Sequence, residues 1–194
     1  MDTERLLLNF ENYAKVLKKY FPEEGTDRFL EDYSVRLTTC PRGLTNEDGG
    51  EHGALIDHMT RVALAAKDHT SLLDKKFGPD VIDKKSVTRV CLVHELGKLG
   101  TIDEDMYIVQ ESQWHRDKLG QNFKYNDNCP KMSFSHRTLC MLQHYNMKLS
   151  ESEYIAILTC QGMHFPENSF YGKILSPVGK ILHFAKSIVD LEHN

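Results

Sequence analysis

The stretch KSVTRVCLVHELGK, residues 85–98, has the pattern of an amphipathic helix that carries a histidine and a carboxylate into a buried region. Val87, Cys91, His94 and Lys98 follow one another at offsets of 0, 4, 7 and 11 residues. This spacing places the four side chains along one stripe of a helix. We therefore expect the histidine to face neighbouring elements rather than open water, with the glutamate next to it.

Helical patterns also dominate on both sides of this stretch. Apolar periodicity, capping residues and breakers predict helices over about residues 3–20 and 27–38. Further helices are predicted in ALIDHMTRVALAA (54–66), SFSHRTLCMLQHY (133–145), SESEYIAILTCQGMH (150–164), and from Ser176-Pro177 onward. The length suits one well-packed core. We predict an all-α, single-domain helical bundle over 1–194, with N-terminal helices in 1–40 and the core in 41–194.

Residues 99–132 differ from the rest of the chain. They contain the short β-prone runs MYIV and NFKYN around a glycine, which favours an inserted loop or hairpin. The run QWHRDKLGQNFKYN concentrates aromatic and basic residues, among them Trp114. This insertion is a candidate lid that stacks on a base and covers phosphates. The alternative is a surface hairpin that packs Trp114 against the core.

Composition limits the classes of partner. Apolar residues make up 40% and charged residues 27% of the chain, and the formal net charge is −4. These values give no electrostatic footprint for nucleic acid or an anionic membrane, so a small-molecule partner is favoured. An acidic N-terminus, the lack of a long apolar run, and five cysteines without a CxxC pair favour a cytoplasmic protein with reduced thiols. Whether the chain forms a homo-oligomer stays open.

Three residues on two helices form a candidate metal site. His58, His94 and Glu95 offer imidazole nitrogens and a carboxylate, which suit divalent first-row metals. Such a metal polarises a phosphoryl group or lowers the pKa of its bound water. The alternative is that both histidines lie at the edge of the core and satisfy their hydrogen bonds locally.

Two segments resemble a known family. GGEHGALIDHMTRVALAA (49–66) and CLVHELGKLG (91–100) are similar to the first two motifs of the HD-domain metal-dependent phosphohydrolase superfamily. SHRTLCMLQ (135–143) is similar to a later helix of that family that carries a further active-site histidine, here His136. The resemblance covers roughly residues 40–190. It implies an HD-like helical fold and hydrolysis of phosphoester bonds, often in nucleotides, with one or two divalent metals.

Carried over by position, His58 and His94 correspond to the first two metal ligands, and Lys98 to the lysine after the family's His-Asp pair. Glu95 stands where the family has Asp, which lengthens the ligand but keeps its charge. Cys160 stands where related sequences often place histidine; a thiolate would serve as a ligand, whereas a neutral thiol would not.

The last departure lies in LHFAKSIVDL, residues 182–191. Lys186 stands where the family has the final Asp of the metal site. Its ammonium would pair with the Glu95 carboxylate and occupy the place of the metal cation. Asp190, four residues later on the same helical face, is the alternative fourth ligand.

Two functions follow from these residues. The leading hypothesis is a metal-dependent phosphohydrolase acting on a nucleotide or related phosphoester; the alternative is a catalytically inactive HD-like protein that binds a ligand or partner without a metal. The predicted metal (Mn, Co, Ni, Zn, Fe or Mg) would be held by His58, His94, Glu95 and Asp190. The residues predicted to act on the substrate are Glu95, Lys98, His136 and Arg61.

Overall fold

The computed structural model describes residues 3–79 and 81–191 and is built mostly of helices, as predicted. The elements in chain order are α1 (Thr3–Tyr20), α2 (Glu24–Asp32), α3 (Ser34–Thr39), η1 (Asn46–Asp48), α4 (Ala54–Phe77), α5 (Lys84–Val93), η2 (Leu96–Leu99), β1 (Tyr107–Val109), α6 (Gln113–Leu119), β2 (Phe123–Tyr125), α7 (Phe134–His144), α8 (Glu151–Thr159), α9 (Pro166–Ser169), η3 (Phe170–Lys173) and α10 (Pro177–Leu191). None of the helices in these two ranges is long and apolar enough to cross a membrane.

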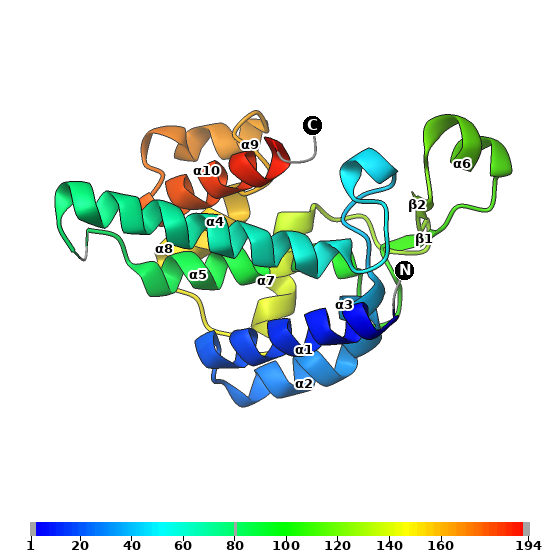
Figure 1. Cartoon of the computed structure of the whole chain (residues 1–194), viewed down its shortest axis with the longest axis horizontal. Coiled ribbons are helices and arrows are strands. Elements are labelled where there is room, and N and C mark those ends of the chain that lie inside the picture. The colour runs from blue at the N-terminus through cyan, green and yellow to red at the C-terminus, as the bar shows by residue number, and fades with distance from the viewer. Residues whose placement is uncertain (1–2, 80, 192–194) are drawn as a thin grey trace.

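Helix α4 runs through the middle of the bundle, with α5 and α10 packed along it (Figure 1). Helix α8 contacts α10 and α5, while α7 contacts α8 and the short helix η2. Helix α1 packs against α4 and α5, α3 packs against α4, and α2 lies on the outside against α1 and α3 (Figure 1). The apolar faces of these helices join into one hydrophobic core, which includes Leu17, Leu55, Val90 and Leu182.

The two N-terminal predictions have different outcomes. The first helix covers Thr3–Tyr20, as expected. The single helix expected over 27–38 is wrong, because the chain forms α2 and α3 with a break at Tyr33, whose backbone has φ −109° and ψ 11°. Its buried ring packs against Phe29 and Tyr145, at centroid distances of 5.2 and 6.2 Å. The contact with Tyr145, at the end of α7, is a tertiary interaction that helical periodicity does not report.

The insertion contains the expected hairpin. Strands β1 and β2 pair in antiparallel register, and α6 lies between them in sequence and stands away from the body of the bundle (Figure 1). The Asn122 side-chain amide donates to the Gly50 carbonyl at 2.8 Å, which ties the insertion to the loop before α4. Trp114 on α6 is 59% exposed, so the alternative in which this ring packs against the core is wrong.

A buried ion pair joins three parts of the bundle. Arg89 on α5 donates through Nε to the Glu153 carboxylate at 2.8 Å, and another of its nitrogens donates to the Tyr20 carbonyl. Glu153 also completes the predicted capping box of α8, because its other carboxylate oxygen accepts from the Ser150 backbone N–H at 2.8 Å. The pair therefore holds α5, α8 and the end of α1 together.

Candidate metal centre

The His-Glu pair lies at the point where α5 ends. Val93 is the last residue of α5, His94 caps it, and the chain then turns into η2. Gly97 lies directly against α7, since a Cβ at its position would be 2.1 Å from the Phe134 carbonyl oxygen. Its backbone N–H also donates to the Thr138 hydroxyl at 2.8 Å. The glycine after the pair thus allows α7 to pack closely behind it.

Helix α4 brings a second imidazole to this turn. The His58 and His94 rings lie 6.0 Å apart between centroids and are both buried. One ligating atom from each of His58, His94 and Glu95 lies within 4.8 Å of the others. The fold therefore brings together the three residues that the sequence nominated, at a spacing suited to a single ion.

Both imidazoles are neutral. Burial lowers the pKa of His58 to about 2 and that of His94 to about 3, with the Lys186 ammonium adding to the effect at His94. The His94 Nδ1 lies 2.9 Å from the Cys91 carbonyl oxygen, which makes Nδ1 the donor and leaves Nε2 as a lone-pair acceptor. Among the described residues, His94 Nε2 and both ring nitrogens of His58 have no hydrogen-bond partner. The alternative that both histidines satisfy their hydrogen bonds locally is therefore wrong for His58.

The Glu95 carboxylate carries the charge of the site and has two ammonium groups against it. The Lys98 Nζ donates to Oε2 at 2.9 Å, and the Lys186 Nζ donates to Oε1 at 3.1 Å. Burial alone would raise the pKa of Glu95, but these two cations hold it well below its usual range. Burial likewise opposes the charge on Lys186, yet the Glu95 carboxylate raises the pKa of Lys186 above its ordinary value. Both members of this pair are charged.

Further contacts fix Lys186 in this position. Its ammonium also donates to the Cys160 carbonyl at 2.9 Å, so α8 and α10 both contribute to its site. The Cys160 thiol donates to the His94 carbonyl at 3.4 Å, and burial raises its pKa. A neutral, hydrogen-bonded thiol is a poor metal ligand, which removes the thiolate that the sequence left open.

Asp190 has a different partner from the one predicted. Its carboxylate accepts from the Arg42 guanidinium at 2.6 Å, and its side chain is 43% exposed. The same guanidinium lies 4.0 Å from Glu95 Oε2. Asp190 thus neutralises a loop arginine at the edge of the cluster, and it does not belong to the group of three potential ligands.

The donor atoms suit a divalent cation, but the surrounding charges do not. Lys98, Lys186 and Arg42 face two carboxylates, Glu95 and Asp190, so the cluster already has one excess positive charge while the imidazoles are neutral. A divalent ion would bring two more positive charges into a site whose carboxylate oxygens are both taken by ammonium groups. The residues therefore do not fit a divalent metal while Lys186 holds this position.

The remaining predicted residues lie elsewhere. His136, in the first turn of α7, is exposed, and its Nδ1 lies 2.5 Å from the Ser133 hydroxyl. Arg61 lines a surface cavity together with His69 of α4 and residues of α10. Five of the cavities in the described parts of the chain are lined by residues other than His58, His94 and Glu95. Of the residues predicted to act on a substrate, Lys98 and Glu95 alone belong to the cluster.

Sequence reasoning missed Arg42. This residue lies in the loop between α3 and α4, where neither helical periodicity nor a motif marks it, and a basic residue in a polar loop is ordinarily solvated.

Comparisons with family models, with curated proteins and with solved structures found no match to this chain. In chemical terms, the cluster consists of the Glu95 carboxylate, neutralised by two ammonium groups, and two neutral imidazoles whose remaining ring nitrogens have no hydrogen-bond partner among the described residues.

Proposed function

We propose that the chain is a non-catalytic HD-like protein, in which the Lys186 ammonium takes the place of a metal and the helical body serves ligand or partner binding. The observation that carries this proposal is the 3.1 Å contact between Lys186 Nζ and Glu95 Oε1. By the resemblance described above, Lys186 stands where an HD hydrolase has its final metal-binding Asp. The substitution thus removes a ligand and supplies a competing cation at once.

Burial supports this proposal further. The Glu95 side chain is 3% exposed, so an entering ion would have to separate it from both ammonium groups without compensation by water. Separating a buried ion pair is strongly unfavourable, because each charge is then left in a medium that solvates it poorly.

Metal binding by matched variants tests the proposal. We expect calorimetric titration with Mn²⁺, Co²⁺, Ni²⁺ and Zn²⁺ to detect no stoichiometric site in the wild-type protein. Lys186→Asp restores a carboxylate and removes the competing charge, so it should bind about one equivalent of metal, and the added change His94→Ala should abolish that site. Lys180→Asp, the same change at an exposed position of α10, is the control and should bind none.

The opposite result would support a second candidate function, metal-dependent hydrolysis of a nucleotide phosphoester. One observation favours it: buried nitrogens of His58 and His94 lack partners, as ligand atoms do before a metal binds. This function requires one equivalent of metal in the wild-type protein, lost in His94→Ala, and release of phosphate from a panel of ribo- and deoxynucleotides. Those two results together would overturn the non-catalytic proposal.

A further inference from the structure

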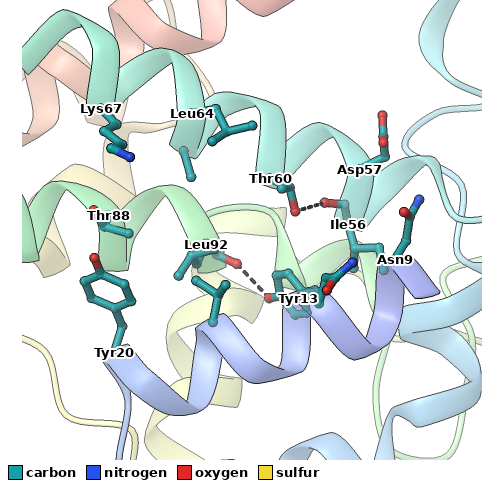
Figure 2. Close-up of a pocket in the computed structure, with 13 residues that line it drawn as sticks. Asn9, Tyr13, Tyr20, Ile56, Asp57, Thr60, Leu64, Lys67, Thr88 and Leu92 are labelled. Carbon is teal, nitrogen blue, oxygen red and sulfur yellow. Dashed lines mark hydrogen bonds between the residues drawn. The ribbon is translucent and has the colours of Figure 1, made fainter. Parts of the chain in front are cut away.

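Helices α1, α4 and α5 enclose a groove away from the His-Glu cluster. Its volume is about 330 Å³, and apolar side chains, among them Val16, Ile56, Leu64 and Leu92, make up much of its lining (Figure 2). Leu64 projects from α4 and is 57% exposed. An apolar groove with a large exposed leucine at its edge is a common feature of protein interfaces.

The edge of this groove on α4 has a symmetric pattern. Asp57, Thr60, Leu64 and Lys67 line the groove at successive spacings of 3, 4 and 3 residues, so they share one face of the helix. Asp57 and Lys67 lie at opposite ends of the groove (Figure 2), about 15 Å apart along the helix axis at 1.5 Å per residue. Position 62 is the midpoint of both the outer and the inner pair.

Asp57 and Lys67 are also the two charged residues among those that line the groove; α1 and α5 contribute neutral side chains. Within the parts of the chain that the structure describes, neither the Asp57 carboxylate nor the Lys67 ammonium forms an ion pair. The groove thus has one unpaired negative and one unpaired positive charge, placed symmetrically about its centre.

We propose that a second copy of this chain docks in the groove, with the two α4 helices antiparallel about a two-fold axis near position 62. In that arrangement Asp57 lies against Lys67 of the partner subunit, and Lys67 lies against Asp57 of the partner subunit. A two-fold interface requires this self-complementarity, and a surface with the pattern Asp-Thr-Leu-Lys about its midpoint provides it. Leu64 of each subunit then enters the groove of the other. The inference does not rest on the proposed function, because the groove and the cluster share no residue.

Charge exchange tests the pairing directly. We expect the full-length protein to show a reversible monomer–dimer equilibrium by sedimentation velocity, with a Kd on the order of 10 µM. Asp57→Lys or Lys67→Asp alone brings like charges together at both ends and should weaken dimerisation at least about 30-fold. The double variant restores opposite charges and should dimerise within about threefold of wild type.

A mixture of the two single variants gives the most discriminating test of the charge pairing. Asp57→Lys carries lysine at both positions and Lys67→Asp carries aspartate at both, so each should be monomeric alone while the mixture forms a heterodimer. Leu64→Glu should abolish dimerisation, and Val35→Glu, at a position that is 73% exposed on α3 outside the groove, should leave it unchanged. A monomer at all concentrations up to about 1 mM, the weak end of specific association, would overturn the proposal and leave the groove to another occupant. A dimer that is insensitive to the charge exchange would overturn it equally.

Discussion

Replacing Glu95 with glutamine keeps the size of the side chain but removes the negative charge between the ammonium groups of Lys98 and Lys186. The two contacts are 2.9 and 3.1 Å long. At an effective dielectric constant of about 20, each attraction amounts to about 5–6 kcal/mol before the cost of taking the charges out of water. Desolvation offsets much of this sum, and breaking a buried pair by removing one partner lowers the free energy of unfolding by about 3–5 kcal/mol. We expect Glu95→Gln to lose that amount.

Urea denaturation followed by far-ultraviolet circular dichroism near neutral pH measures this loss, provided that the m-value stays unchanged. The matched control is Glu31→Gln, the same chemical change at an exposed position of α2, which should alter the free energy of unfolding by less than about 0.5 kcal/mol. Lys186→Met and the double variant Glu95→Gln/Lys186→Met complete a cycle. Because the double variant removes both charges, it should be more stable than the sum of the single losses implies, by about 2–3 kcal/mol.

The outcome distinguishes an internal ion pair from a site kept for a metal. A buried carboxylate that awaits a metal and has no counter-charge destabilises the metal-free protein, so its replacement with glutamine would be neutral or stabilising. That result, or additive losses around the cycle, would refute the reasoning that Lys186 neutralises Glu95. Chelator in the buffer keeps the comparison free of adventitious metal.

Two further predictions concern the parts of the fold that support the cluster. Glu153→Ala leaves buried Arg89 without its carboxylate and removes the glutamate's contact in the capping box of α8, so it should lower the free energy of unfolding in urea by about 3–5 kcal/mol. Glu151→Ala, at an exposed position two residues earlier, should lower it far less. Gly97→Ala places a Cβ 2.1 Å from the Phe134 carbonyl oxygen, so it should displace α7 and lower the free energy of unfolding by about 2–4 kcal/mol. An unchanged thermal midpoint in Gly97→Ala would show that α7 does not need this close approach.

Signals that act over a few residues carried the successful predictions from sequence. Apolar periodicity located the helix Thr3–Tyr20, and Ser150 with Glu153 marked the start of α8 through a capping box. The same reasoning nominated His58, His94 and Glu95, because two neighbouring helices whose apolar faces pack together bring residues on or beside those faces close to one another. Helix periodicity and capping depend on neighbours three or four residues away, so the sequence alone reports them.

Which cation lies beside Glu95 was decided by the tertiary structure. From the sequence, Lys186 and Asp190 were alternatives one turn apart on the same helix, and Arg42 had no visible role. In the folded protein, Lys186 contacts the carboxylate of Glu95, 91 positions earlier in the chain. Asp190 contacts the guanidinium of Arg42, 148 positions earlier. Spacing along one helix specifies which side chains share a face, but the depth and rotation at which that face meets other elements come from the packing of the whole core. The sequence by itself determined most of the helices and the three candidate ligands, whereas the fold determined that an ammonium completes their site.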